Sequence, residues 1–246
     1  MKNNEFYDNI SGDYDSMLNF NKLIETRKEA LKKFIKSGYK NAIDIGCGTG
    51  VDSIALRMNG MNVAGYDTSL KMLQKARLNS KERNLKIIFS NSPVQSIGTA
   101  HHSKYDIIVS LGNAIANINL QTLNKIFNKV YKLLKPGGMF LIQILNYDSV
   151  RKSGKRIVNI TSGNGNIFIR FYDIKKSKLS FNILRINDKN LKDFNMITTE
   201  LYEYRKAELK KLLNKNGFNK IQFYSDLNKS KFNSKSSKDL IILAEY

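Results

Sequence analysis

A short apolar run that leads directly into a cluster of glycines constrains this chain more than any other feature. The run Ile43–Ile45 precedes Gly46, Gly48 and Gly50, and a helix-compatible segment begins at Val51. An apolar run of this length is typical of a buried parallel strand. The glycines allow positive φ angles and let a ligand approach the backbone, and the free N–H groups at the helix start form a polar cradle. The segment therefore predicts a strand, turn and helix unit of an α/β domain, with a ligand site at the turn.

Strand-like and helix-like segments alternate along most of the remaining sequence. The pattern predicts helices over 1–36, 51–58, 69–81, 120–134 and 206–214, and strands over 41–45, 62–66, 85–89, 105–111, 139–145, 220–224 and 240–245. Alternation of this kind implies a mainly parallel sheet with right-handed crossovers. We therefore expect a doubly wound α/β fold with a seven-stranded sheet, whose last two strands can pair as an antiparallel hairpin.

The alternation stops for a stretch in the second half of the chain. Segments 167–172, 179–186 and 196–204 alternate β-branched and aromatic residues with polar ones, and no helix is predicted between them. They predict an antiparallel β insertion over 151–200, within a single domain that spans 1–246. We expect this insertion to sit as a lid on the domain.

Composition narrows the class of protein. The chain has 246 residues and a formal net charge of +20, which raises nucleic acid as a partner. Most of that charge is lysine in a chain also rich in Asn and Ile, a combination that an A/T-rich genome produces without any such partner. The single cysteine, Cys47, excludes an internal disulfide, and His101 and His102 offer no metal-ligand spacing. Since no apolar stretch suits a signal peptide or a membrane span, we expect a cytoplasmic protein with neither metal nor membrane association.

Two carboxylates stand at informative positions around the glycine turn. Asp44 lies two positions before Gly46, and the spacing Gly-x-Gly-x-Gly differs from the Gly-x-Gly-x-x-Gly of dinucleotide sites. An acid beside the turn favours a cationic ligand, such as a sulfonium amino acid, over a pyrophosphate. Asp67 ends the next predicted strand, where such an acid accepts hydrogen bonds from both ribose hydroxyls. Its alternative role is that of a helix N-cap.

On these motifs the chain resembles the glycine N-methyltransferase branch of the class I S-adenosylmethionine-dependent methyltransferases. The likeness is carried by Gly46–Ala76, and it continues at Ser110–Ala114, Lys135–Gly138 and Asn146–Asp148, with a weaker match at 201–205. It implies a Rossmann-like methyltransferase fold, S-adenosyl-L-methionine as the cofactor and a small molecule as the methyl acceptor. The predicted insertion would then form the lid of the acceptor site.

The resemblance also implies roles for individual residues. For the cofactor these are Tyr14, Asp44, Gly46, Cys47, Gly48, Thr49, Gly50, Asp67, Thr68, Met72, Ser92 and Leu111, with Asn91 or Pro93 as alternatives to Ser92 beside the adenine. For the acceptor they are Tyr7, Asn113, Asn146, Tyr147 and Tyr202, of which Asn113 and Tyr202 are the candidate catalytic residues. Methyl transfer needs no covalent intermediate with the protein, so we expect catalysis by positioning and by exclusion of water.

One departure from the family pattern bears on the acceptor. Glycine-methylating relatives carry an arginine just before Asn-Tyr-Asp, where this chain has Leu145. An apolar side chain cannot pair with a carboxylate, so we expect an amine or hydroxyl of a molecule other than glycine. A replacement cation could come from one of the arginines that follow: Arg151, Arg156, Arg170 or Arg185. Two other functions stay open, namely methylation of RNA, which Ser110–Asn113 does not favour, and cofactor binding without catalysis.

Overall fold

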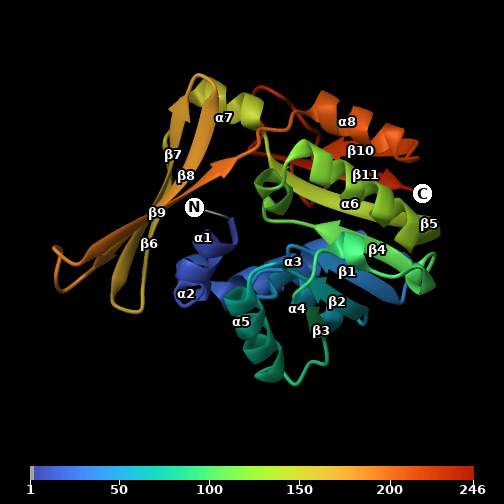
Figure 1. Cartoon of the computed structure of the whole chain (residues 1–246), viewed down its shortest axis with the longest axis horizontal. Helices are drawn as coiled ribbons and strands as arrows, with labels where there is room; N and C mark the ends of the chain where they lie inside the picture. The colour runs from blue at the N-terminus through green and yellow to red at the C-terminus, as the bar shows by residue number, and fades with distance from the viewer. Residues whose placement is uncertain (1–2) are drawn as a thin grey trace.

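The computed structural model describes residues 3–246, whose strands form two separate sheets (Figure 1). The larger sheet has seven strands in the order β10-β11-β5-β4-β1-β2-β3. They are β1 (Asn41–Ile45), β2 (Asn62–Tyr66), β3 (Ile88–Ser90), β4 (Tyr105–Ser110), β5 (Leu134–Leu145), β10 (Lys220–Tyr224) and β11 (Asp239–Glu245). Strands β1 to β5 are parallel, whereas β11 runs antiparallel to both β5 and β10. The predicted doubly wound sheet with its C-terminal hairpin is confirmed.

Helices cover both faces of the large sheet. The described α-helices are α1 (Asn3–Ile10), α2 (Tyr14–Leu18), α3 (Phe20–Lys32), α4 (Val51–Met58), α5 (Leu70–Lys81), α6 (Leu120–Leu133), α7 (Tyr147–Ser153) and α8 (Lys206–Lys215). Helices α6 and α8 pack on Ile43, Phe140 and Ile142 of one face, and α3 and α4 pack on Ile107 and Leu141 of the other. Within residues 3–246, no helix is long and apolar enough to cross a membrane.

The winding direction of the sheet reverses between β1 and β4. From β1 the chain winds outward to β2 and β3, and from β4 it winds the other way to β5. β1 and β4 themselves pair directly, from Ala42 opposite Ile107 to Asp44 opposite Val109. Because the loops after these two strands diverge, a crevice opens at their carboxyl ends. β1 brings the glycine turn to this crevice, and β4 brings Leu111.

The two largest departures from the predicted boundaries have identifiable reasons, and smaller ones occur at β3 and β9 (Phe194–Leu201). The helix predicted over 1–36 is broken into three by a turn at Gly12 and by Asn19, whose φ of 53° is incompatible with a continuous helix. Residues 1 and 2 of that prediction lie outside the described part. Strand β5 starts at Leu134, earlier than predicted, because Leu134 already pairs with Tyr105 of β4. The helix therefore ends where the stop signal predicts, and a tertiary pairing extends the strand back to that point.

The second sheet is antiparallel and lies at the left of Figure 1, beside the N-terminal helices. Its strands, in spatial as well as chain order, are β6 (Ile157–Gly163), β7 (Asn166–Lys175), β8 (Lys178–Asn187) and β9 (Phe194–Leu201). The predicted insertion is therefore present, with β6 as an additional strand. Its inner face packs through Phe168, Ile183 and Ile197 against Phe6 of α1 and Met17 of α2. The N-terminal helices thus lie between this sheet and the crevice.

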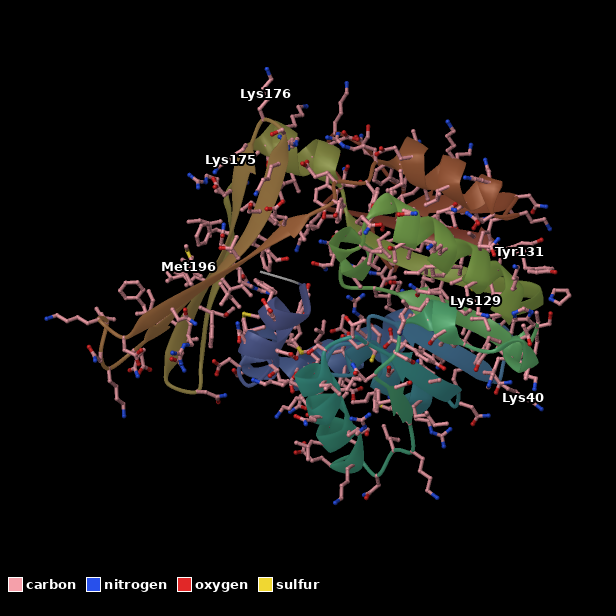
Figure 2. All side chains as sticks on the ribbon, viewed as in Figure 1. Lys40, Lys129, Tyr131, Lys175, Lys176 and Met196 are labelled. Carbon is pink, nitrogen blue, oxygen red and sulfur yellow. The ribbon has the colours of Figure 1, made fainter. Side chains whose placement is uncertain are left out.

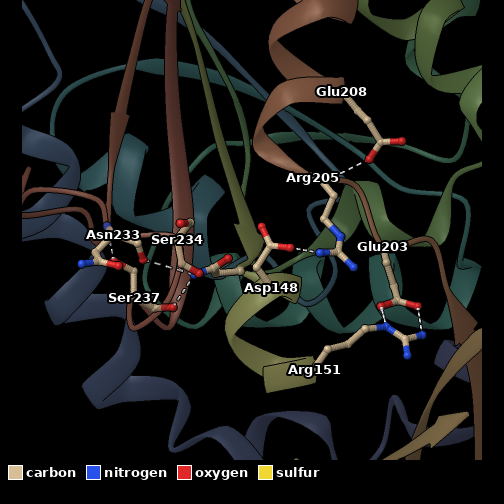
Figure 3. A network of polar contacts seen from close by, with 9 residues as sticks. Asp148, Arg151, Glu203, Arg205, Glu208, Asn233, Ser234 and Ser237 are labelled. Carbon is tan, nitrogen blue, oxygen red and sulfur yellow. Dashed lines mark hydrogen bonds and ion pairs between the residues drawn. The ribbon is translucent and has the colours of Figure 1, made fainter. Parts of the chain in front are cut away.

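Ion pairs hold both chain segments that connect the two sheets. Arg151 of α7 donates to the two carboxylate oxygens of Glu203, from Nε at 2.5 Å and from Nη2 at 2.6 Å. Asp148 of the same helix pairs with Arg205, whose backbone N–H donates to Glu208 at 2.8 Å. Figure 3 shows these contacts joining α7 to the segment that returns from β9. The insertion is therefore fastened where the chain leaves the large sheet and where it comes back.

Candidate active site

A cavity of about 270 Å³ opens where the winding of the sheet reverses. Most of the residues predicted for the cofactor line it, together with one predicted for the acceptor: Tyr14, Gly46, Cys47, Gly48, Thr49, Asp67, Thr68, Met72, Ser92, Leu111 and Tyr7. The wall also includes residues that the sequence did not single out, among them Arg27, Asp52, Tyr66, Gln95 and Asn117. Chain segments far apart in sequence therefore meet around one enclosed space.

The glycine turn forms one wall of the cavity. The backbone N–H groups of Gly46 and Cys47 both donate to the Tyr66 carbonyl, at 2.8 and 3.1 Å, which ties the turn to β2. Gly46, Gly48 and Gly50 have φ angles of 72°, 53° and 93°, the left-handed region that favours glycine. Gly50 caps α4 and does not line the cavity, contrary to the prediction for it. Burial raises the pKa of the Cys47 thiol, so this side chain is an uncharged filler.

Asp67 links the glycine turn to the start of α5. Its Oδ2 accepts the N–H of Gly48 at 2.9 Å, and its Oδ1 accepts the N–H of Ser69 at 2.8 Å. Burial raises the pKa of this carboxyl, and the two N–H groups oppose that shift. The N-cap role belongs to Ser69, whose hydroxyl accepts the N–H of Met72 at 3.1 Å. Asp67 therefore both lines the cavity and holds two of its walls together.

Asp44 lies behind the turn and does not line the cavity, and its role in binding the cofactor stays a prediction. It is 1% exposed, and its Oδ2 accepts a hydrogen bond from Ser53 Oγ at 2.6 Å. Burial, together with repulsion from Asp52, raises the pKa of Asp44 to about 8. This acid acts on a ligand in the cavity through its charge and not through contact.

Arg27 of α3 reaches into the cavity, and no sequence motif pointed to it. Its Nε lies 3.2 Å from Oδ1 of Asp52, and its Nη2 donates to Oε1 of Gln143 at 2.8 Å. The same Gln143 oxygen accepts the N–H of Gly112 at 3.3 Å, and Gln143 Nε2 donates to Asp239 at 3.3 Å. A chain of polar contacts therefore runs from the cavity to Asp239, the first residue of β11. The available signal was the position of Arg27 on the buried side of an amphipathic helix.

Two tyrosines from the N-terminal helices cover the cavity. The rings of Tyr7 and Tyr14 lie 6.5 Å apart in an edge-to-face arrangement, and Asn117 Nδ2 donates to the Tyr7 hydroxyl at 3.0 Å. Burial raises the pKa of both tyrosines, so their hydroxyls stay protonated. Since α1 and α2 pack against the antiparallel sheet, that sheet supports the cover. A cover of this kind limits the access of water to a bound ligand.

The structure gives Asn146 a different role from the predicted contact with the acceptor. The residue is 3% exposed and does not line the cavity. Its amide nitrogen donates to the backbone carbonyls of Ser234 at 2.9 Å, Ser237 at 2.8 Å and Asn233 at 3.4 Å. Asn146 therefore fastens the loop that precedes β11.

Three other residues predicted for the acceptor also lie off the cavity wall. Asn113 and Tyr147 contact each other. The amide nitrogen of Asn113 donates to the Tyr147 hydroxyl at 3.1 Å, and this hydroxyl lies 3.2 Å from Oδ1 of Asn113. That oxygen also accepts the N–H of Leu145 at 3.0 Å. Tyr202 is 46% exposed, stacks on Tyr204 and bonds to Ala116 through its backbone N–H. A catalytic role for Asn113 or Tyr202 stays a prediction.

Together these features define a nucleoside-binding domain of the doubly wound α/β class, adapted to a ligand with a positive charge. Two buried polar atoms of the cavity wall, Thr49 Oγ1 and Gln95 Oε1, have no hydrogen-bond partner within the described part of the chain. Buried polar atoms are normally paired, so these two fit a site that a polar ligand completes. The residues present therefore fit a cationic nucleoside.

Comparison with known proteins identifies the family. Residues 42–138 match the methyltransferase domain family. The chain is 21% identical over 225 residues to a glycine/sarcosine N-methyltransferase of Parasynechococcus marenigrum (strain WH8102), covering 90% of this chain and 78% of that protein. It is 30% identical over 107 residues to a ubiquinone biosynthesis O-methyltransferase of Bordetella avium (strain 197N), covering 44% and 43%.

A solved structure agrees with this assignment. The fold matches that of a S-adenosylmethionine-dependent methyltransferase from Clostridium acetobutylicum ATCC 824 with a TM-score of 0.74, at 18% identity, over 97% of this chain and 98% of that one. The fold is that of the Rossmann-like methyltransferases, and the chain is a S-adenosylmethionine-dependent methyltransferase whose cofactor is S-adenosyl-L-methionine.

The glycine turn offers a test of the cavity's geometry. A Cβ atom at Gly46 would stand 2.7 Å from Cβ of Ala114, at a backbone φ of 72°. We expect Gly46→Ala to lower the free energy of unfolding by about 1–3 kcal/mol and to weaken binding of S-adenosylhomocysteine at least about tenfold. Gly48→Ala is the matched control, because its φ is also positive but its Cβ would meet nothing within 4 Å. Urea denaturation and calorimetry measure both effects, and equal results for the two variants would refute the contact.

Proposed function

We propose that this enzyme transfers the methyl group of S-adenosylmethionine to an amine, or a hydroxyl, of a small molecule other than glycine. The observation that carries the proposal is the charge around the cavity. In a chain with a net charge of +20, the carboxyls of Asp44, Asp52 and Asp67 gather at the turn against one arginine, Arg27. Burial raises the pKa of all three acids, so a bound cation relieves a real electrostatic cost.

The residues that line the cavity have separate roles toward the methyl donor, S-adenosylmethionine. Asp67 stands where it can accept hydrogen bonds from the ribose hydroxyls, and Arg27 can pair with the carboxylate of the methionine part. Tyr7 and Tyr14 exclude water from the reaction. When bound, the cofactor supplies an electrophilic methyl group on its positively charged sulfur. The protein then has to hold the acceptor atom in line with that methyl group, about 3–3.5 Å away.

On the acceptor side, an acid stands next to the position where glycine-methylating relatives carry an arginine. Leu145 of β5 lies directly opposite Asp239 of β11. Gln143 connects Asp239 to Arg27, because it accepts a hydrogen bond from Arg27 and donates one to Asp239. A carboxylate at this place repels the carboxylate of an amino acid and attracts an ammonium group. Burial raises the pKa of Asp239, which suits it to take the proton that an amine must lose before methylation.

The same charges disfavour an RNA substrate. Of the described residues that line the cavity, none is a lysine, and Arg27 is the residue proposed above to pair with the cofactor's carboxylate. A base-modifying enzyme needs cations beside its pocket to hold the phosphates that flank the flipped base. No described lysine therefore stands in the cavity wall, where a flipped base and its phosphates would need one.

A methyl-transfer screen tests the proposal. The purified protein is incubated with methyl-labelled cofactor and, separately, with glycine, with pools of amines that lack a neighbouring carboxylate, with hydroxyl compounds and with total tRNA. We expect label in an amine or hydroxyl pool and none in glycine or tRNA. Labelling of tRNA or of glycine above the level of the Asp67→Ala protein would reject the proposed acceptor class. If no pool is labelled although the cofactor binds, a small-molecule acceptor of this kind is likewise rejected.

A further inference from the structure

The outer face of the antiparallel sheet, which points away from α1 and α2, is apolar across its central rows. Strand register sets Ile160, Ile169, Leu184 and Met196 side by side across β6, β7, β8 and β9. The next row contains Ile167, Ile186 and Phe194, and the row on the other side contains Ile157 and Phe171. We call these nine side chains the outer apolar face.

No segment within residues 3–246 covers the outer apolar face. Four of its members are highly exposed, namely Ile157 (61%), Ile160 (60%), Phe194 (62%) and Met196 (55%). The remaining five are partly exposed. Figure 2 shows Met196 on the outer side of the sheet, away from the rest of the molecule. The inner face of the same strands is buried against the N-terminal helices, so both faces of this sheet are apolar.

The size of this surface matches a stable interface. The nine side chains expose on the order of 600 Å², if a large apolar side chain has roughly 150–200 Å² to bury. Two polar neighbours in the same rows, Ser162 and Thr198, add to this area, whereas Asn182 is buried. A specific protein interface takes about 800 Å² from each partner. Monomers rarely expose a continuous apolar patch of this extent.

We propose that the outer apolar face is the interface of a homodimer, in which the antiparallel sheets of two copies pack face to face about a two-fold axis. Flat sheet faces with interdigitating apolar rows pack in this way at about 10 Å. An isologous contact needs one surface that complements itself, and a two-fold axis brings the same rows of both copies together.

Charge distinguishes a second copy from other occupants. The three rows of the face contain no charged residue among those that the register defines. The first charges beyond them, Asp173 and Glu200, already pair with Arg156 and Lys178. An acidic protein or an anionic lipid surface would be recognised by lysines within the patch, which this face lacks. Although the chain has a net charge of +20, this surface is uncharged and apolar, so it is complementary to the identical surface of a second copy.

The dimer would also affect the active site. The sheet that carries the outer apolar face supports α1 and α2 from its inner side, and these helices place Tyr7 and Tyr14 over the cavity. Packing two sheets together would therefore hold the cover of each copy in place. The proposal stands on the exposed surface alone and is independent of the acceptor's identity.

The experiment measures the mass of the protein in solution. We expect light scattering at micromolar concentration to give twice the chain mass of 28.1 kDa for the wild type. Ile160→Lys combined with Met196→Lys should give a single chain mass, because each dimer would bury four unpaired lysines, and the dissociation constant should rise at least about 100-fold. Ile88→Lys, at a position that is 72% exposed on β3, is the matched control and should leave the dimer intact.

Three results would overturn the proposal. One is a monomeric wild type, and another is a dimer that the double substitution does not dissociate. The third is a monomer whose binding to vesicles of anionic lipid is lost in the double variant, which would assign the face to a membrane. Thermal stabilisation by S-adenosylhomocysteine, measured on each variant, shows that the substituted proteins are folded.

Discussion

Replacing Asp67 with alanine is expected to weaken the binding of S-adenosylhomocysteine by about 100-fold or more. The substitution removes the proposed hydrogen bonds from the ribose hydroxyls to the carboxylate, and hydrogen bonds to a charged group contribute about 1.5–3 kcal/mol each. The carboxylate also accepts the N–H groups of Gly48 and Ser69, so both donors lose their partner in the variant. We therefore expect the unliganded protein to unfold at a lower temperature as well. Titration calorimetry measures the affinity, and thermal denaturation measures the stability.

Ser69→Ala separates the two effects of that substitution. It removes the N-cap of α5, at a cost of about 1 kcal/mol of stability, and leaves the Asp67 carboxylate in place. Its affinity for S-adenosylhomocysteine should stay within a few-fold of the wild type. An Asp67→Ala protein that binds as tightly as the wild type would show that the ribose does not lie at this carboxylate.

The second large effect is a loss of affinity for the cofactor as the pH falls below about 8. The pKa of Asp44 is raised to about 8 by burial and by repulsion from Asp52, so the unliganded protein protonates this carboxyl below that pH. A sulfonium binds better to the ionised acid, and the affinity for S-adenosylmethionine should fall by up to about tenfold per pH unit. S-adenosylhomocysteine, whose sulfur is uncharged, should show a weaker dependence. Asp44→Asn should remove the difference between the two ligands, as measured by calorimetry from pH 6 to pH 9.

The same shift has the opposite consequence for the stability of the unliganded protein. Because the pKa of Asp44 in the folded state lies above its value in the unfolded chain, its favourable contribution is complete at low pH and is lost as the pH rises through about 8. Asp44→Asn keeps the shape of the side chain, and Ser53 can still donate to it. Above pH 8 the variant should therefore unfold at a higher urea concentration than the wild type. Identical stability of the two proteins across the pH range would show that the ionisation of Asp44 does not affect the free energy of unfolding.

Short-range patterns predicted the elements closest to the glycine turn correctly. The helix over 51–58 and the strand over 62–66 have the predicted bounds, because hydrophobic periodicity and glycine spacing are properties of the local chain. The predictions were least accurate where pairing with a distant strand decides the outcome, as at Leu134, or where a single backbone angle interrupts a helix, as at Asn19.

For the candidate site too, the prediction was more accurate for residues close to the glycine turn than for residues that distant elements contribute. Residues next to the turn line the cavity because a strand, turn and helix leave few choices for where the backbone runs. For the acceptor, the sequence named residues near the right edge of the sheet, but it did not show where their side chains point. Asn146 points to the loop before β11, and Asn113 points to Tyr147. Conversely Arg27 and Asp239 come from distant elements and could only be recognised once those elements were packed.

The order of amino acids alone was sufficient for the class of fold and for the glycine turn, since glycine conformation, strand burial and helix capping act over a few residues, and the family resemblance of the same segment indicated the cofactor. Packing decided which charges surround the cavity, which side chains cover it and which face of the second sheet is left bare. These properties depend on contacts between segments more than a hundred residues apart, such as Arg27 with Gln143. Burial, and with it the pKa of an acid such as Asp44, exists only after those segments have come together.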